Sequence, residues 1–420
     1  MKPLHALQDS ARDEAPSAWL ADRRDQGLEL FDELPMPTSD EEVWRYVDLD
    51  FSLDDLSLPS EPGAPMSDGD YRIEYGARAV IVDGYVTSAT SDEQVVVKQL
   101  KDAAPEQLAA AEESAIAVDL DRFAAAHYGF GDDGLLVVAP KGSSAPRPVL
   151  IDVQAVTPDT LSLPRILLLA EDQSELSVVV TFRSPEDDTF HVVPHVQALV
   201  GDGARLLLTT VQAWGYGTTA IGQQRAVIGR DGFFHHGEAG IGSRLGRLHF
   251  SVELAGPGAH SEISGLYFGE DEQVLDYRAF ITHKAPHTTS NMFLKGAVED
   301  EAHSVFTGLI RIEEEAQKVN AYQTNRNLVL GDAAGAESVP NLEILANDVK
   351  CGHASTVGPL DEEQRYYLMS RGLDRVRSDR LQVRGFFEEA LGRMPHPELN
   401  DAIRVSVNEK YVRAQEEGRQ

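Results

Sequence analysis

The chain has 420 residues and a mass of 45.9 kDa, which is enough for two or three domains with a sizeable core. Lys and Arg number 37 against 69 Asp and Glu, so the formal net charge at pH 7 is 37 − 69 = −32. This charge disfavours binding to nucleic acid or to anionic lipid, since both need clustered cations. The single cysteine, Cys351, excludes an internal disulfide and any four-cysteine metal site within the chain.

The first residues contain no apolar segment of the kind found in secretory signal peptides. No stretch approaches the run of about 18 apolar residues that a membrane-spanning helix needs. We therefore expect a cytoplasmic protein that binds neither membrane nor nucleic acid.

Residues 1–130 predict a helical and mixed region. An apolar stripe favours a helix that ends before Pro35; its members are Trp19, Leu20, Arg23, Leu28, Phe31 and Leu34. Ser39 and Glu42 have the spacing of a capping box and predict a short helix through Tyr46. Residues 57–70 hold three prolines and two glycines and are typical of a linker. The following pattern predicts strands at 78–83 and 94–99 and helices near 105–113 and 118–128.

Residues 131–358 change to short aliphatic and β-branched runs separated by Gly, Pro, Asp or Ser. The first of these runs cover residues 135–139, 149–153, 166–170, 176–182, 192–200 and 204–211. No long helical pattern interrupts them before about residue 360. Closely spaced strands over this length indicate a sandwich, a barrel or a β-solenoid.

A weak internal repeat favours the solenoid. Six stretches that begin polar and turn apolar start at His260, His287, His303, Lys318, Glu337 and His353, with spacings of 27, 16, 15, 19 and 16 residues. Stacked turns that share one core produce such a pattern. The spacings are irregular, and the hexapeptide pattern of left-handed acyltransferase helices is absent. We therefore predict a mainly β protein with a parallel β-helix core.

Residues 359–420 predict a separate helical domain. Helices are expected at 364–371, 378–391 and 398–416. One face of the second helix is apolar; its members are Leu381, Phe386, Phe387, Ala390 and Leu391. A face of this kind is expected to bind a partner.

Two motifs are weak indications of a binding site. Gly129, Gly131 and Gly134 match a dinucleotide-binding pattern, but a helix precedes them and a strand follows, which reverses the required order. The histidines of the pairs His191–His195 and His235–His236 lack an evident third ligand for catalytic zinc. His191 and His195 would share one face of a strand, whereas His235 and His236 would lie on opposite faces.

Other signals of chemistry are also weak. In a chain this acidic, the carboxylate runs at 270–272 and 313–315 are expected to be solvated. Neither a phosphate-binding P-loop nor a G-x-S-x-G nucleophile motif occurs in the sequence.

One pattern, around the cysteine, favours a metal site. In an extended segment, side-chain alternation places Cys351 and His353 on one face, near enough to share a soft metal ion. Lys350 is adjacent and would favour the thiolate. The alternative is a buried cysteine that packs as a small hydrophobic residue. Because an iron–sulfur cluster ordinarily takes four ligands, a second chain would have to supply the others.

Several segments resemble the SufB/SufD scaffold family of iron–sulfur cluster assembly. The most specific is residues 348–373 (DVKCGHASTVGPLDEEQRYYLMSRGL); residues 42–46, 123–142, 291–310 and 321–330 also match. The resemblance runs from about residue 40 to residue 395. Within the family the chain is similar to the SufD branch, because SufB is longer, richer in cysteine and carries a Glu-His-Glu run where this chain has Gly352-His353-Ala354.

The resemblance implies a non-enzymatic scaffold subunit in a complex of one SufB, one SufD and two copies of the ATPase SufC. It implies that right-handed parallel β-helices of SufB and SufD pair, and that each C-terminal helical domain binds one SufC. ATP-driven SufC dimerisation would then rearrange the pair and open the site of a nascent cluster. The candidate ligands in this chain are His353 and, in second place, Cys351, at the interface with SufB.

Two alternatives stay open at this point. One is a SufB-like main scaffold in a homodimer, which the single cysteine disfavours. The other is a carbohydrate-active β-helix enzyme in which clustered carboxylates act in a groove. Self-association of the chain when SufB is absent also stays open.

Overall fold

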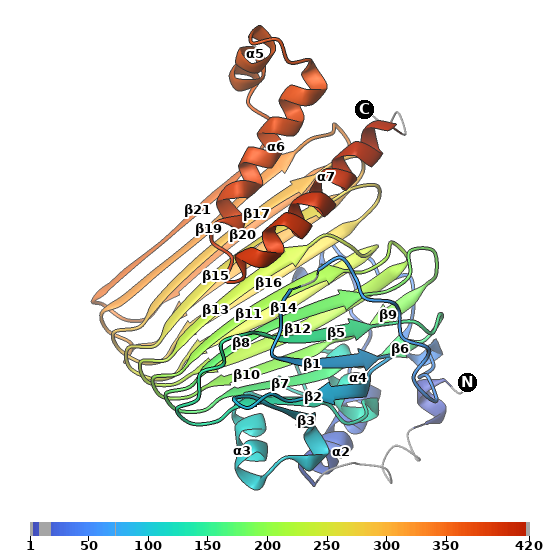
Figure 1. Cartoon of the computed structure of the whole chain (residues 1–420), viewed down its shortest axis with the longest axis vertical. Coiled ribbons are helices and arrows are strands. Elements are labelled where there is room, and N and C mark those ends of the chain that lie inside the picture. Colours follow the sequence, from blue (N-terminus) through green and yellow to red (C-terminus); the bar gives the residue numbers. More distant parts are fainter. Residues whose placement is uncertain (1–2, 8–17, 72, 417–420) are drawn as a thin grey trace.

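The computed structural model describes residues 3–7, 18–71 and 73–416, and most of them form a β-solenoid flanked by helices (Figure 1). The strands are β1 (Ala77–Val82), β2 (Tyr85–Thr90), β3 (Val96–Gln99), β4 (Leu135–Ala139), β5 (Val149–Gln154), β6 (Leu161–Ser162), β7 (Arg165–Ala170), β8 (Glu175–Arg183), β9 (Phe190–Val192), β10 (His195–Val200), β11 (Arg205–Ala213), β12 (Thr218–Ile228), β13 (Phe233–Gly240), β14 (Leu245–Leu254), β15 (His260–Gly269), β16 (Val274–His283), β17 (Thr289–Val298), β18 (His303–Ile312), β19 (Val319–Val329), β20 (Gly335–Ile344) and β21 (Val349–Gly358).

The helices lie at the two ends of the chain. The α-helices are α2 (Ala18–Glu33), α3 (Pro105–Glu113), α4 (Arg122–Phe130), α5 (Glu362–Ser370), α6 (Arg375–Leu391) and α7 (Asn400–Glu416). Short 3-10 helices are η1 (Leu4–Ala6), η2 (Glu42–Trp44), η3 (Leu53–Asp55), η4 (Leu100–Asp102) and η5 (Pro397–Leu399). No helix in the described ranges is long and apolar enough to span a membrane.

The strands form two long sheets. A ten-stranded sheet has the order β2-β1-β5-β8-β11-β13-β15-β17-β19-β21. The main path of an eleven-stranded sheet is β20-β18-β16-β14-β12-β10-β7-β4-β3, with β6 and β9 beside it. Pairing is parallel except for β1–β2 and β3–β4. The predicted mainly β architecture and parallel solenoid are therefore confirmed.

The repeat unit is one whole turn, which gives one strand to each sheet. In the ten-stranded sheet, residues 27–31 apart in sequence stand side by side; they are Arg205, Phe233, His260, Thr289, Asn320 and Lys350. The spacings of 15 to 19 residues in the sequence therefore correspond to half a turn, from a strand of one sheet to the next strand of the other. The first spacing of 27 passes over β16, which the sequence pattern missed.

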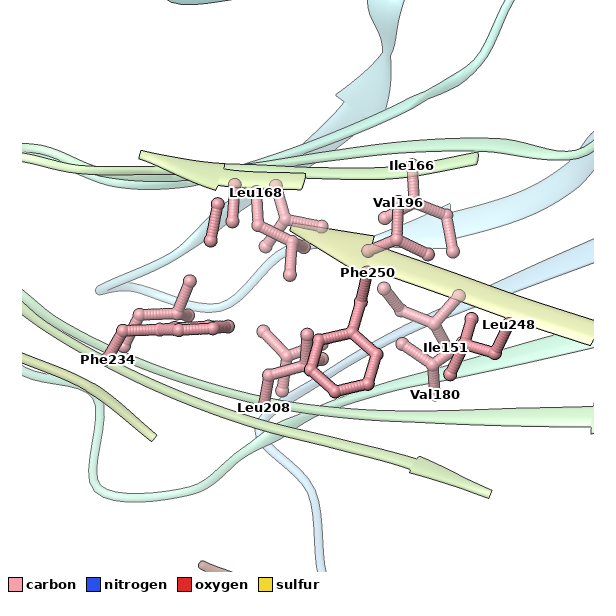
Figure 2. Packing of buried hydrophobic residues seen from close by; sticks show 14 of the residues in the cluster. Ile151, Ile166, Leu168, Val180, Val196, Leu208, Phe234, Leu248 and Phe250 are labelled. Atoms are coloured by element: carbon pink, nitrogen blue, oxygen red, sulfur yellow. The ribbon is translucent and has the colours of Figure 1, made fainter. Parts of the chain in front are cut away.

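Alternate side chains of each strand point into the solenoid and form one continuous core (Figure 2). Ile151, Val180, Leu208 and Phe234 come from the ten-stranded sheet and meet Leu168, Val196, Leu248 and Phe250 from the other sheet. Burial of each such side chain stabilises the fold by about 1.5–3 kcal/mol. Because every turn packs on the next, the core has no internal boundary between turns.

The turns explain why Asp and Gly separate the apolar runs. Asp231, Asp271 and Asp300 have φ values of 51°, 53° and 55°. Aspartate adopts this left-handed conformation more readily than β-branched residues do. The chain can therefore reverse within a few residues at the edge of the solenoid.

The two ends of the chain cover the outer faces of the sheets. Helices α6 and α7 lie along the ten-stranded sheet, where Phe387 packs against Phe268 with ring centroids 6.1 Å apart (Figure 1). Residues of α2, α4 and the segment around Trp44 cover the eleven-stranded sheet at Leu161 and Leu245. Each outer sheet face is therefore covered over part of its length.

Of the predictions for the N-terminal residues, the amphipathic helix is confirmed and the capping box is not. Helix α2 has the predicted apolar stripe, with Leu20, Leu28 and Phe31 buried. The capping box is wrong: Ser39 precedes only the 3-10 helix η2, whose N-cap residue makes no side-chain cap bond. Instead, the Glu41 carboxylate accepts the Thr38 N–H at 3.1 Å.

Residues 57–70, predicted to be a linker, are held against the solenoid. The Gly63 N–H donates to Asp83 at 3.0 Å, and the Met66 N–H donates to the side chain of Gln154 at 2.7 Å. Beyond this segment, the Tyr71 hydroxyl lies 2.8 Å from Ser406 of α7. The segment therefore joins the first turns of the solenoid to the last helix.

Most predicted strands are present, with two local differences. The run at 192–200 is interrupted at Pro194, so that β9 and β10 are separate strands. The polar strand β2 was missed, since its residues alternate little and are mostly exposed. β1 and β3 come from the first 130 residues and pair with β5 and β4 of the sheets. The division of the chain into domains at 131 and 359 stays a prediction.

Two of the three glycines of the dinucleotide-like motif, Gly129 and Gly134, serve packing. A Cβ on Gly27 of α2 would lie 2.7 Å from the Gly129 nitrogen, so the two helices cross closely at this point. A Cβ on Gly134 would lie 3.1 Å from that of Arg165. The buried Arg165 guanidinium donates to the His127 carbonyl near the C-terminus of α4, where a cation is stabilised by the helix dipole.

Six histidines, five buried and one (His249) partly buried, are held neutral by the fold. Burial lowers the pKa of His236 to about 3 and the pKa values of His249, His283 and His396 to about 4. Burial also lowers the pKa values of His127 and His195 well below their usual value. Fewer groups have a shifted pKa that opposes the effect of these histidines on stability. One of them is Glu238, because burial raises its pKa to about 8.

We expect the free energy of unfolding to fall as the pH drops from about 6.5 toward 4. Histidines of the unfolded chain bind protons below about pH 6.5, whereas these six stay neutral in the folded chain, so acid favours unfolding. Each contributes up to about 1.4 kcal/mol per pH unit in this window. Urea unfolding as a function of pH measures the slope. His283→Gln should reduce the slope by about one histidine's share, and an unchanged slope would contradict this account.

Candidate functional site

The last turn of the solenoid is open. β21 ends the ten-stranded sheet and β20 ends the eleven-stranded sheet, and the two strands contact β18, β19 and each other. We call β20 and β21 together the open turn; it lies at the orange end of the sheets in Figure 1. Large apolar side chains are exposed in or beside the open turn, with 41–47% of their surface accessible: Tyr322 of β19, Val339 and Ile344 of β20, Leu345 directly after β20, and Val357 of β21. One turn earlier, the inward-facing equivalents of Ile344 and Val357 are Ile312 and Asn327, and both are buried.

Cys351 and His353 lie on the inner face of β21. Cys351 stands beside Ala321 and His353 beside Gln323, and both of these β19 neighbours are buried inside the solenoid. The predicted same-face placement therefore holds. Across the interior, the Ser355 hydroxyl lies 2.8 Å from that of Ser338 on β20.

The position of His353 follows from the residues on either side of it. Ser338 and Ser355 face each other, and Leu342 and Cys351 pack against the same apolar cluster around Ile310. Since β20 and β21 run in opposite directions around the turn, Pro340 lies across from His353. His353 is exposed, because no further turn covers it.

Cys351 behaves as a half-buried thiol. Burial raises its pKa above the usual value, and the N–H of Gly352 opposes this only in part. Lys350 occupies the opposite face of β21, so the expectation that Lys350 favours the thiolate is wrong. The apolar contacts of Cys351 also agree with the alternative interpretation as a small hydrophobic residue.

Gln323 closes the interior beneath His353. Its side chain is fully buried and spans to β20, where Nε2 donates to the Asn341 carbonyl at 3.0 Å. A Cβ on Gly308 would clash with the Gln323 amide oxygen, so this glycine makes room for the amide. Gln323 was not predicted from the sequence; its signal there is a glutamine at an inward position of an otherwise alternating strand.

The core becomes polar as it approaches the open turn. The Tyr267 hydroxyl donates to Asn327 at 2.7 Å and accepts from Asn325 at 3.1 Å, and both asparagines are buried. Gly296 leaves the space that the Tyr267 ring occupies. A satisfied polar network of this kind fixes one packing arrangement below the site.

The other histidine candidates are dispersed. His191 packs on Phe51, and His195 stacks on His127 with ring centroids 3.5 Å apart, both outside the solenoid core. His235 and His236 point to opposite faces, toward Ser264 and Thr210 respectively. Within residues 3–7, 18–71 and 73–416, no three His, Cys, Asp or Glu side chains are grouped as metal ligands.

The acidic run at 270–272 differs from expectation at one residue. Glu270 is buried, and its carboxylate lies 3.4 Å from the ammonium of Lys410 on α7. The expectation that this run is a solvated surface is therefore wrong for Glu270, which instead helps to hold the last helix.

Comparison with known proteins identifies the family. Residues 153–386 match the family described as "SUF system FeS cluster assembly, SufBD core domain". The chain belongs to the SufBD family of iron–sulfur cluster assembly proteins. A family member of Mycobacterium tuberculosis is 33% identical over 69% of this chain and 74% of its own length.

The SufD branch is represented among the relatives. The SufD of Bacillus subtilis is 27% identical over 94% of both chains, and that of Escherichia coli is 31% identical over 40% of both chains. The resemblance to SufD seen in the sequence is thus confirmed. The carbohydrate-active enzyme considered as an alternative is set aside.

We expect the Cys351 thiol of the isolated chain to react slowly with iodoacetamide at neutral pH. Its raised pKa leaves little thiolate, so the rate should be lower than that of an unstructured cysteine peptide and should rise above pH 9. Lys350→Ala should leave the rate within about twofold, because that side chain points away from the thiol. A large decrease in the Lys350→Ala rate would contradict this placement.

Proposed function

We propose that the chain is a non-catalytic scaffold subunit that pairs with SufB through the open turn and carries a SufC ATPase on its C-terminal helices. The nascent iron–sulfur cluster is the cargo of this complex and is bound between this chain and SufB. The observation that carries the proposal is the open turn, which joins two ligand-type side chains to two unpaired strand edges in a SufD relative.

The ligand count supports a shared site. Cys351 and His353 are alternate residues of one strand, and soft iron accepts thiolate and imidazole. A cluster ordinarily takes four ligands, so these two side chains would hold one side of it and SufB the other. His353 is the stronger candidate because it is exposed, whereas the Cys351 thiol must lose a proton and some of its apolar contacts to bind iron.

We expect His353→Ala to remove most of the visible charge-transfer absorbance of an anaerobically reconstituted complex while assembly with SufB and SufC stays intact. The reason is the loss of one of about four ligands at an exposed site. His287→Ala is the matched control, since His287 is also exposed but lies in a turn. An unchanged spectrum in the His353 variant, with unchanged complementation in cells, would reject His353 as a ligand.

The surface for SufC differs from the one expected from the sequence. Phe387 is buried against the solenoid, and Lys295 holds α6 by donating to the Phe386 carbonyl at 2.7 Å and pairing with Glu389 at 2.8 Å. The expectation that this face is free for a partner is therefore wrong for Phe387, Ala390 and Leu391, whereas Leu381 is exposed. Substitution of Phe387 by Asp would detach α6 from the sheet and would not report on docking.

Helix α5 offers a better docking surface. None of its residues is buried, and Tyr366 and Tyr367 are 77% and 58% exposed. The side chain of Arg365 fixes the helix to α6 through Asp379 at 2.5 Å. A groove of about 880 Å³ beside α5 is lined in part by Tyr367, Leu368 and Leu381. Exposed tyrosines on a fixed helix are typical of protein interfaces.

We expect Tyr366→Asp combined with Tyr367→Asp to abolish co-purification of SufC while SufB still binds. The double substitution places two charges on the surface that would be desolvated on docking. Val405→Asp on α7 is the control, because Val405 is 55% exposed but lies away from α5. Stoichiometric SufC retained by the double variant would show that SufC docks elsewhere.

A further inference from the structure

A groove runs between α6 and α7, which lie at an angle to each other on the outside of the ten-stranded sheet (Figure 1). Its volume is about 440 Å³, and it shares no lining residue with the groove beside α5. One wall is Val405 of α7, which is 55% exposed. The floor is apolar and comes from both helices: Val383, Phe387, Leu391, Val407 and Tyr411. A concave, mainly apolar site of this size is typical of small-molecule binding.

The charged side chains of the groove have a net positive charge. Three arginines and two acids line it, so its formal charge is 3 − 2 = +1 in a chain of −32. Both acids are already paired with Arg404, whose guanidinium donates to Glu388 at 2.7 and 2.9 Å and also to Asp401. The hydrogen bonds from Arg404 lower the pKa of Glu388, so this acid stays ionised and paired at neutral pH. The positive charge that is left therefore belongs to the other two arginines.

These two arginines, Arg380 and Arg384, lie one helical turn apart on α6. Asn408 of α7 fixes Arg380, because its side-chain oxygen accepts the Arg380 Nε–H at 2.6 Å. An amide is neutral, and no carboxylate in the described part of the chain forms an ion pair with Arg380. Arg384 has only a long contact of 3.8 Å with Glu388. This end of the groove thus presents a guanidinium in a fixed position without a counter-charge.

The shape of the groove favours a thin, linear occupant. Its α6 side extends from Arg380 to Leu391, which is 11 residues or about 16 Å at 1.5 Å per residue. An extended acyl chain of about a dozen carbons has this length, at roughly 1.2 Å per bond. The floor side chains are at most 7% exposed, so a bulky partner helix could reach little of them. A hydrocarbon chain is thin enough to lie along them.

We propose that the groove between α6 and α7 binds a linear acyl chain that ends in a carboxylate, such as a medium-chain fatty acid. The hydrocarbon covers the apolar floor, and the carboxylate pairs with Arg380 and Arg384, since a guanidinium matches a carboxylate in charge and geometry. The occupant contacts both helices and would hold them at one separation. The site is distinct from Cys351 and His353 and does not depend on the proposed function.

Isothermal titration calorimetry of the full chain with decanoate, below its micellar concentration, tests the site. Decanoate should bind one to one, and decanol should bind at least about tenfold more weakly because it lacks the charge that the arginines recognise. Hexanoate should also bind at least about tenfold more weakly, since it covers less of the floor. Equal affinities for decanoate and decanol, or the absence of saturable binding, would overturn the proposal.

Two variants locate the carboxylate and the chain. Arg380→Gln combined with Arg384→Gln should weaken decanoate binding at least about tenfold and leave decanol binding unchanged. Arg377→Gln is the matched control, because Arg377 is also exposed on α6 but lies outside the groove and pairs with Asp374 at 3.5 Å. Val405→Asp should weaken the binding of both ligands. An equal loss of decanoate affinity in Arg377→Gln would indicate unspecific attraction and would overturn the site.

All four substituted positions are exposed, so the fold should be retained, and the unfolding midpoint checks this. If a variant is destabilised, the ratio of decanoate to decanol affinity in the unaltered chain decides the question. An acidic amphipathic helix peptide tests the other possible occupant. If the peptide displaces decanoate and binds more tightly, the groove is a protein interface and the proposal is overturned.

Discussion

Each turn of the solenoid is stabilised by the turn stacked upon it, and the last turn has none. The stacking supplies both main-chain hydrogen bonds and the burial of alternate side chains such as Leu208 and Phe234. On the side of β20 and β21 that no further turn covers, both the main-chain hydrogen bonds and the burial of side chains are missing. Apolar side chains and peptide groups therefore stay exposed there. A second solenoid end would satisfy both at once. The candidate ligands lie at the place where the fold is least complete, which is where the proposed two-chain site would form.

The rest of the chain covers surfaces other than this end. The outer faces of both sheets are apolar, and α4 with Trp44 covers one while α6 and α7 cover the other. The contacts of Phe387 with Phe268 and of Lys410 with Glu270 fix the C-terminal helices to the sheet. Helix α5 is left without buried residues. A partner on α5 and a partner on the open turn would therefore use separate surfaces, both attached to one rigid core.

The local part of the candidate site could be predicted from the sequence. Side-chain alternation depends only on the strand itself, so Cys351 and His353 were correctly placed on one face. Gln323 and Pro340 could not be found in this way. They are brought to His353 by β19, one turn earlier, and by β20, half a turn earlier, and the register between turns is set by loops of variable length. Whether the Cys351 thiol keeps its proton also depends on those neighbours, because they bury it. The sequence shows only the adjacent Lys350, so the effect of Lys350 on the thiol was overestimated.

The sequence by itself determined the class of fold, the approximate limits of most strands and the unusual segment around Cys351, because hydrophobic periodicity and turn residues are local signals. Tertiary structure alone decided which apolar faces are buried. The same periodicity describes Phe387, which packs on the solenoid, and Val357, which is exposed at its end. Burial of Glu270 beside Lys410 was likewise invisible to composition, since charge counts do not show which acids meet a cation. The −32 charge disfavours nucleic acid and anionic lipid as partners, and the stacking of turns decides which strand edges and apolar side chains stay exposed.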